Sequence, residues 1–144
     1  MTMRPIAIAT WSFGVAAVGK SGEILAANAS ALDAMEQGIR VAELDVTVPT
    51  VGYGGMPNAA GVMEMDAAIM DGATHDVGCI AALVDCKTPI SVARAVMEHS
   101  RHSMLVGTGA REFATAHGFA VEDALHETAR ETYHLWLEDG HAKP

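Results

Sequence analysis

Residues 77–84 read VGCIAALV, a continuous apolar run without a charged side chain. A run of this length and character predicts a strand that is covered on both of its faces. Thr88-Pro89 follows and predicts the start of a helix, because a hydroxyl residue can cap a helix and proline suits the first helical position. A buried strand that leads into a helix indicates an α/β fold.

Strands and helices alternate along the rest of the sequence. Other strands are expected over residues 5–11 (PIAIATW), 62–70 and 103–107, with a turn at Asp71-Gly72. Helices are expected from a Ser30 N-cap to about Leu44, from Pro89 onward, over residues 109–117 up to a stop at Gly118, and over residues 121–139. Residues 20–28 are expected to loop or to begin a helix, and residues 140–144 to form a polar tail. We therefore expect one domain over residues 1–144, with about four strands and four helices.

The composition narrows the class of protein. Half of the 144 residues are apolar, and aromatic residues make up only 5%. Small residues such as alanine and glycine allow helices to pack closely on a sheet, which also fits an α/β domain. The net charge is −9, and the nine lysines and arginines form no cluster. Because a nucleic-acid partner needs a basic face, we expect none.

The sequence predicts neither a membrane-spanning helix nor a secretory signal. No apolar run reaches the roughly 18 residues of a membrane-spanning helix. The N-terminal residues MTMRPIAIATW lack the apolar length and the cleavage site of a secretory signal. We therefore expect no membrane partner and a cytoplasmic protein, unless a leader has been removed.

Residues 50–55 read TVGYGG and place three glycines within four positions. Glycine is used where the backbone bends sharply or approaches another group closely. The stretch lacks the Lys-Ser/Thr pair of a Walker loop and the GxGxxG spacing of a dinucleotide site, so a phosphate cradle is not expected. A plain turn and the wall of a site completed by another chain both remain open.

Two pairs of titratable residues are candidates for acid–base chemistry. Glu64 and Asp66 are two apart on one predicted strand, and His75 precedes Asp76. Paired carboxylates, or a histidine oriented by a carboxylate, can move protons. Neither pair comes with a nucleophile, and no GxSxG motif is present. A surface or loop role is therefore favoured for both pairs.

The histidines and cysteines are candidate zinc ligands, but their spacing in the sequence does not support a zinc site. His99 and His102 are three apart near a predicted helix end, and Cys79 and Cys86 lie in an apolar stretch. No CxxC, HxxxH or HExxH pattern accompanies them. We predict two buried thiols, polar histidines near a helix end, and no metal.

Four stretches of the chain, in this order and spacing, resemble one family. They are TWSFG at residues 10–14, SALDAMEQG at 30–38, TVGYGGMPN with MEMDAAIMDGAT at 50–58 and 63–74, and ISVARAVMEHSRHSMLVGTGAREFATAHGF at 90–119. Together they look like the α subunit of the glycosylasparaginases, relatives of the plant-type asparaginases and isoaspartyl peptidases. The resemblance extends from Ile6 to about Trp136.

The resemblance implies an N-terminal nucleophile hydrolase. In this family a precursor cleaves itself before a threonine in a His-Asp-Thr setting, and that threonine begins a separate β chain. Its hydroxyl attacks the substrate amide and its free α-amino group is the base. The implied fold is a four-layer αββα sandwich shared by the α and β chains, and the implied assembly is an (αβ)2 heterotetramer. His75-Asp76 is followed by Val77, so it does not match the cleavage site.

The resemblance also implies which residues of this chain meet the substrate. Trp11 matches the tryptophan that lines the pocket, and Phe13 is its neighbour in the same motif. Thr50 matches a hydroxyl position beside the nucleophile, where it would hydrogen-bond the threonine's amino group. The catalytic threonine itself is expected on the β chain. The GYGG form differs from the longer loop that holds a structural sodium in the plant-type relatives, so no metal or cofactor is expected.

The function implied is hydrolysis of a side-chain amide. The leading substrate is N-acetylglucosaminyl-asparagine, which would yield aspartate. Two alternatives stay open: a plain asparaginase or isoaspartyl peptidase, and a non-catalytic α-like binding module that never had a nucleophile.

Overall fold

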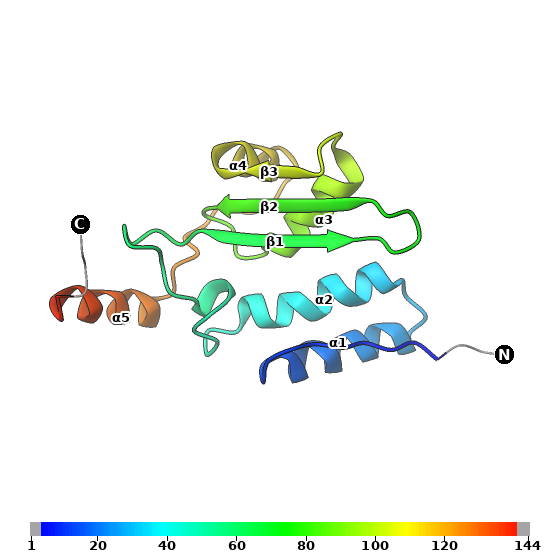
Figure 1. The fold of residues 1–144 in the computed structure, drawn as a ribbon, viewed down its shortest axis with the longest axis horizontal. Coiled ribbons are helices and arrows are strands. Elements are labelled where there is room, and N and C mark those ends of the chain that lie inside the picture. The colour runs from blue at the N-terminus through cyan, green and yellow to red at the C-terminus, as the bar shows by residue number, and fades with distance from the viewer. Residues whose placement is uncertain (1–3, 141–144) are drawn as a thin grey trace.

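The computed structural model describes residues 4–140, which form a three-stranded sheet and five α-helices (Figure 1). The elements are α1 (Gly14–Ala26), α2 (Ala31–Leu44), the 3₁₀ turn η1 (Gly52–Gly54), β1 (Met65–Met70), β2 (Val77–Leu83), α3 (Pro89–His99), β3 (Met104–Val106), α4 (Gly107–Ala116) and α5 (Glu127–Glu138). The prediction of a mixed α/β fold is confirmed at this level. The predicted polar tail lies outside the described residues, apart from Gly140.

The sheet has the order β1-β2-β3 and combines two kinds of pairing. β1 and β2 form an antiparallel hairpin, and β2 pairs with β3 in parallel across the intervening helix α3. A bulge interrupts β1 between Met65 and Ala67. At this bulge Asp66 Oδ1 accepts a hydrogen bond from the Ala82 N–H at 2.7 Å. This contact stabilises the irregular register, because a bulge leaves one residue outside the ladder.

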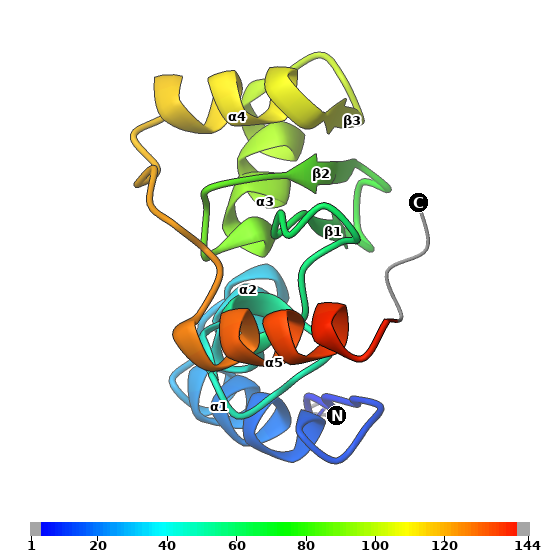
Figure 2. The same ribbon diagram turned by 90° about the vertical axis from the view of Figure 1, so that its left-hand side faces the viewer.

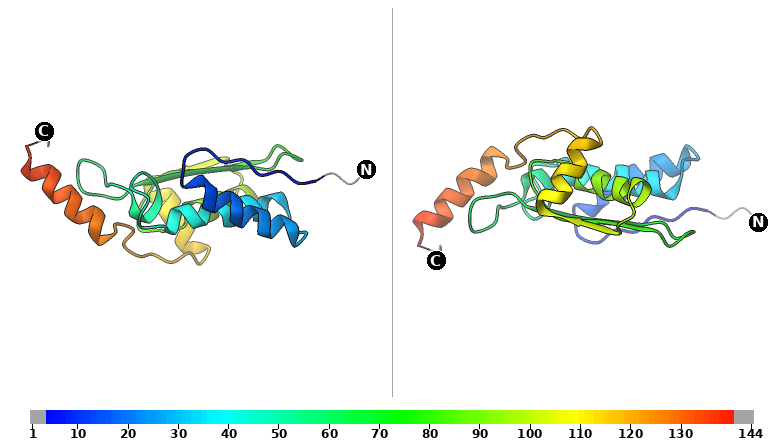
Figure 3. Two further views of the ribbon diagram at one scale, coloured as in Figure 1. Left: turned by 90° about the horizontal axis from the view of Figure 1, so that it is seen from below. Right: turned by 90° about the horizontal axis from the view of Figure 1, so that it is seen from above.

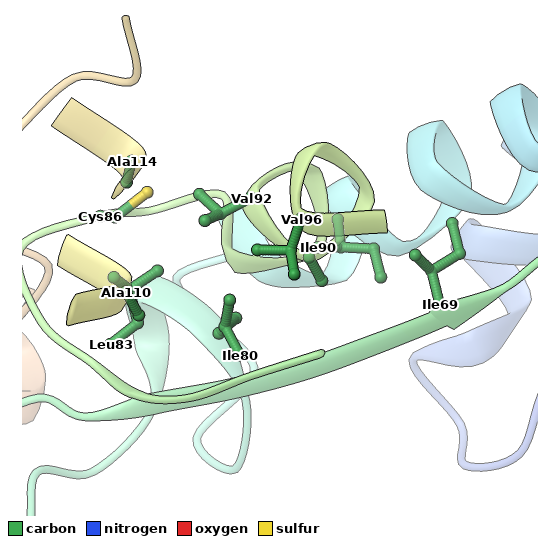
Figure 4. Close-up of a cluster of buried hydrophobic side chains, with 10 residues drawn as sticks. Ile69, Ile80, Leu83, Cys86, Ile90, Val92, Val96, Ala110 and Ala114 are labelled. Carbon is green, nitrogen blue, oxygen red and sulfur yellow. The ribbon is translucent and has the colours of Figure 1, made fainter. Parts of the chain in front are cut away.

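One face of the sheet carries the main core (Figure 4). Ile69, Ile80 and Leu83 point from the strands toward the helices. They meet the buried side chains of α3, α4 and the segment before α3, which are Cys86, Ile90, Val92, Ala93, Val96, Ala110 and Ala114. The alternation of buried positions along β1 and β2 follows from the period of two of a strand.

The other face of the sheet lacks a covering layer in the described residues. α3 and α4 both lie on the core side (Figure 3). Met70, Met104 and Val106 are exposed on the strands, and Cys79 is only partly buried. The prediction that the 77–84 strand is covered on both faces is therefore wrong for this chain alone. Its apolar outer positions have no neighbouring layer among residues 4–140.

α2 begins where its cap predicts. Ser30 Oγ accepts a hydrogen bond from the Asp33 N–H at 3.0 Å, and Asp33 Oδ2 accepts one from the Ser30 N–H at 3.3 Å. This is a capping box, which satisfies two N–H groups that a helix start leaves free. The predicted positions of β2, α3, β3 and α4 agree with the structure within two residues, and β1 begins three residues later than predicted.

α1 is longer than its sequence suggests. Residues 20–28 were expected to loop or to begin a helix, whereas α1 is helical from Gly14 to Ala26. The hydroxyl of Ser21 donates to the Ala34 carbonyl of α2 at 2.8 Å. A Cβ on Gly38 would lie 2.7 Å from the Ala17 carbonyl oxygen and would overlap the Ser21 side chain. Close packing against α2 therefore offsets the low helix propensity of the glycines in α1.

The N-terminal segment is not a strand in the described chain. The prediction of a strand over residues 5–11 is wrong here, since residues 4–10 join no ladder. Ile6 and Ile8 are 81% and 85% exposed. A strand needs hydrogen-bonding neighbours, and none reaches this segment within residues 4–140. In Figure 1 the segment runs beside α1 and does not reach the sheet.

α5 begins six residues later than predicted. The Asp123 carboxylate accepts from the Leu125 N–H at 2.9 Å, which favours a turn, and His126 Nδ1 then caps the helix through the Thr128 N–H. Ala124 and Leu125 are buried in a second small core with Met63, Met65 and Ala129. α5 lies beyond the end of the sheet in Figure 1, and Figure 2, which looks from that side, shows it in front of α1 and α2. No helix within residues 4–140 is long and apolar enough to cross a bilayer.

Candidate functional site

An open cleft of about 760 Å³ lies between the N-terminal segment and the free edge of β1. Its walls come from the segment around Trp11, from α1 and α2, from the loop over residues 50–56, from β1 and from the start of α3. These segments are far apart in the sequence. β1 pairs with β2 on one side only, so its unpaired edge lies along this cleft.

Trp11 lies at the mouth of the cleft. It is 79% exposed, and its backbone has a φ of 68°, which is uncommon for a residue other than glycine. The Trp11 carbonyl accepts a hydrogen bond from the Gly14 N–H at 3.1 Å, and Gly14 packs closely against Ala9. This tight turn leaves a large aromatic ring exposed. Such placement is costly unless a ligand or another chain covers the ring, because exposed aromatic surface stays in water.

The two other residues predicted for the pocket also line this cleft. Phe13 is half-buried and directly precedes α1, and Thr50 is exposed on the loop that leads into η1. The structure thus brings Trp11, Phe13 and Thr50 together at one cleft. Their contact with a substrate remains a prediction.

The glycines after Thr50 approach this same chain. Gly52 has a φ of 64° and is buried. A Cβ at Gly52 would overlap the carbonyl oxygen and Cα of Glu43, and one at Gly54 would lie 2.7 Å from the Val46 oxygen. The sequence left open a plain turn and the wall of a site completed by another chain. Within the described residues, their close neighbours are the end of α2 and the loop after it.

Glu43 is a feature of the cleft that sequence reasoning missed. Its carboxyl group is buried, and Oε1 accepts a hydrogen bond from the Ile90 N–H at 2.8 Å. Oε2 is buried without a hydrogen-bond partner in the described residues. Burial raises the pKa of this carboxyl to about 8, since an ionised group loses its hydration there. One signal was available: Glu43 follows Ile39 by four residues, on the apolar face of α2.

Glu43 also corrects the predicted cap of α3. Thr88 was expected to cap this helix with its hydroxyl, but its side chain makes no capping hydrogen bond. The Ile90 N–H is bound instead by Glu43, from a helix 47 residues earlier in the chain. A carboxyl group suits this place, because the first N–H groups of a helix have no partner within the helix. Pro89 does take the first helical position, as predicted.

Glu64 and Asp66 both line the cleft, but each has a local structural contact. Glu64 Oε2 accepts from the Asn58 amide at 2.7 Å, and Asp66 accepts from Ala82 at the bulge. Neither forms a salt bridge in the described residues, and no nucleophile is hydrogen-bonded to either. Glu64 thus holds the loop at Asn58, and Asp66 holds the bulge of β1 against β2.

His75 and Asp76 lie in the exposed turn between β1 and β2, away from the cleft. The His75 N–H donates to the Asp71 carbonyl at 2.8 Å, and the Asp71 N–H donates to the Asp76 carbonyl at 2.9 Å. The turn predicted at Asp71-Gly72 is therefore confirmed. The pair belongs to a hairpin connection and does not face the cleft.

The histidines and cysteines considered for zinc have other neighbours in the described residues. His99 stacks on His117 with ring centroids 6.0 Å apart. Cys86 is in the main core, as the sequence predicts, while Cys79 is only partly buried. Within residues 4–140, no group of three or more histidine, cysteine, aspartate or glutamate side chains is arranged to hold a metal ion.

The described lining of the cleft supplies polar groups but does not pair a nucleophile with a base. Among the described residues, its ionisable side chains all carry carboxyl groups, and its hydroxyl groups belong to Thr10, Ser21 and Thr50. Ser21 donates to the α2 backbone, and no hydroxyl of the described lining is hydrogen-bonded to a carboxylate. A nucleophile needs a base within hydrogen-bonding reach. No such pair is formed by the described part of the chain.

The family model and the similar known proteins agree on the family of this chain. The model of the asparaginase family matches residues 3–143. The N(4)-(β-N-acetylglucosaminyl)-L-asparaginase of Elizabethkingia miricola is 43% identical over 143 residues, which is 99% of this chain and 42% of that protein. The proteins of that name from Mus musculus and Rattus norvegicus are each 41% identical over 133 residues, covering 92% of this chain and 38% of theirs. The chain thus spans less than half the length of these relatives.

Proposed function

Since the chain belongs to the asparaginase family, we propose that it is the α subunit of an amidohydrolase that cleaves the side-chain amide of N-acetylglucosaminyl-asparagine and releases aspartate. The observation that carries this proposal is the cleft at which Trp11, Phe13 and Thr50 meet, where the described residues form no nucleophile–base pair. A pocket with a recognition wall but no reacting group fits an enzyme whose nucleophile is on another chain. The names of the curated relatives support this choice of substrate.

We infer that the missing part is a β chain from the same precursor. Two features of the described residues support it: the free edge of β1 along the cleft and the uncovered apolar face of the sheet. Unpaired strand edges and exposed apolar faces favour association with another chain. Strands added at the β1 edge and a second sheet on the open face would complete a four-layer αββα sandwich. Two such αβ units would form the (αβ)2 heterotetramer.

The proposed chemistry uses the first residue of the β chain. Its threonine hydroxyl attacks the carbonyl carbon of the substrate amide, and its own α-amino group takes the hydroxyl proton and passes it to the departing amine. Water then hydrolyses the resulting ester, which releases aspartate and restores the threonine. Thr50 would hydrogen-bond the α-amino group, and Trp11 and Phe13 would shape the pocket for the substrate.

Mass spectrometry of the purified full-length protein tests the subunit proposal. We expect two chains, of which the second begins with threonine. An uncleaved protein, or a lone 15 kDa chain, would instead support a non-catalytic α-like module.

A substrate comparison tests the chemistry. The release of aspartate is measured from glycosylated asparagine, from free asparagine and from an isoaspartyl dipeptide. We expect the highest kcat/KM with glycosylated asparagine. A higher value with either of the other two would assign the protein to the plain asparaginases or isoaspartyl peptidases.

Trp11→Ser is expected to raise KM by about 10- to 100-fold with little change in Tm. The loss of an aromatic contact of roughly 1.5–3 kcal/mol gives the first effect, and the 79% exposure of Trp11 explains the second. Cleavage of the precursor should be unaffected. Val15→Ser is a suitable control, because Val15 is 77% exposed and does not line the cleft. An unchanged KM for the Trp11 variant would remove this residue from the substrate pocket.

A further inference from the structure

Glu43 joins three segments under the cleft. It lies at the end of α2, its backbone packs directly against Gly52, and its Oε1 accepts the Ile90 hydrogen bond at 2.8 Å. The turn that carries Thr50 thus packs on the backbone at the end of α2, and the Glu43 carboxyl ties that helix end to the first turn of α3. The Ile90 hydrogen bond spans 47 residues, so Glu43 anchors to α3 the helix end on which the turn packs.

The burial of this carboxyl favours its protonated form. Oε2 is the only buried side-chain oxygen or nitrogen without a hydrogen-bond partner in the described residues. An ionised carboxylate at this place would keep a poorly solvated charge. Desolvation accordingly raises its pKa to about 8, opposed by its hydrogen bond to Ile90 and by Arg40, and assisted by Glu36.

The charged groups around Glu43 are few. Arg40 and Glu36 lie on the same helix, and Cys86, before α3, is the other titratable group that interacts with it. Gly52 and Ile90, its contacts on the turn and on α3, carry no titratable side chain. No nearby cation is positioned to form a direct ion pair with Glu43 within the described residues.

We propose that Glu43 is a positioning residue for the turn that carries Thr50, and that loss of its carboxyl proton loosens this turn and weakens substrate binding. The ionised carboxylate gains hydration only by leaving its buried place, which breaks the Ile90 hydrogen bond and frees the end of α2, whose backbone packs against Gly52, from the first turn of α3. The part of this inference that concerns substrate rests on the proposed function. The part that concerns the turn rests on the contacts of Glu43 alone.

The kinetic test compares the full-length wild-type protein with Glu43→Gln and Glu112→Gln from pH 6 to pH 9.5. Glutamine keeps an oxygen for the Ile90 N–H and never ionises, while Glu112 is an exposed glutamate on α4. For the wild type and Glu112→Gln, we expect KM for glycosylated asparagine to rise up to tenfold per pH unit above the pKa of Glu43, with a smaller change in kcat. For Glu43→Gln, KM should stay flat over this range. The same alkaline rise in all three proteins would overturn the proposal.

A structural test needs no activity and no variant. The Glu43 carboxyl of the ¹³C-glutamate-labelled wild-type protein is titrated by NMR, together with hydrogen exchange of the Gly55 amide, which bonds the Gly52 carbonyl at 3.0 Å. We expect a titration near pH 8 that coincides with loss of protection at Gly55, relative to the rate expected from pH alone. A carboxyl that ionises below pH 5, or a Gly55 amide that keeps its protection, would overturn the inference. Failure of the amide hydrolysis assay alone would overturn only the proposed function.

Global stability gives a further readout with a definite sign. The ordinary pKa of the group is 4.5 and its folded pKa is about 8. Between these values the unfolded chain loses the proton first, so stability falls as pH rises through this window and is level above it. Glu43→Gln should therefore gain Tm relative to the wild type as pH rises from 5 to 8. A difference in Tm that does not change over this range would contradict the proposal.

Discussion

Gly78→Ala is expected to lower the free energy of unfolding by about 3 kcal/mol or more. Gly78 lies in β2 directly under α3 and is buried. A Cβ at this position would overlap the Ala93 carbonyl oxygen and would lie 2.7 Å from both the backbone nitrogen and the Cβ of Met97. Backbone atoms of a helix cannot yield as a flexible side chain does. The helix would have to move off the sheet, which would open the core around Ile80 and Val96.

The measurement is urea unfolding of the full-length protein, with Gly72→Ala as the control. Gly72 lies in the hairpin turn, where an added Cβ meets nothing within 4 Å. The control should stay within about 0.5 kcal/mol of the wild type, as is usual for a surface change. A stability of Gly78→Ala equal to that of the control would show that α3 does not pack on β2 as closely as described.

Gly52→Ala is expected to cost about 2–4 kcal/mol of stability and to raise KM strongly. Two effects add: a φ of 64° is unfavourable for alanine, and its Cβ would overlap the Glu43 backbone. To relieve this overlap, the turn would have to move away from α2. Because Thr50 is on this turn, its hydroxyl would move in the cleft.

The control for this variant is Gly109→Ala on α4, where an added Cβ has nothing within 4 Å. It should be neutral or gain up to about 1 kcal/mol, since alanine is the better helix former. Stability and KM are measured on the same preparations. Lower stability with an unchanged KM would mean that the turn supports the fold but does not form part of the substrate site.

The elements that the sequence predicted well have local causes. α2 is specified by its apolar periodicity and by the Ser30–Asp33 capping box, which involves residues three apart. α3 begins at Pro89 because proline suits this position, and the hairpin turn follows from Asp71-Gly72. Each of these signals acts within a few residues of its effect, so it can be recognised without the rest of the chain.

The elements predicted poorly depend on distant partners. α1 needs its packing on α2, and residues 5–11 need a neighbouring strand that the described chain does not supply. The strand over residues 77–84 is apolar enough to be covered on both faces, but residues 4–140 cover only one of them. For residues 5–11 and 77–84 the local pattern was correct about apolar character, and in all three cases tertiary contacts determined which structure formed.

The candidate site also depends partly on local sequence and partly on contacts between distant segments. The sequence by itself determined the mixed α/β class, the family and the residue types at positions 11, 13 and 50. Only the tertiary structure brought those positions to one cleft, buried Glu43 beneath it and placed Gly52 and Gly78 against backbone from other elements. The physical reason is that desolvation and close packing depend on which distant segments meet. A carboxyl on a helix is an ordinary charged group until another helix and a turn exclude water from it.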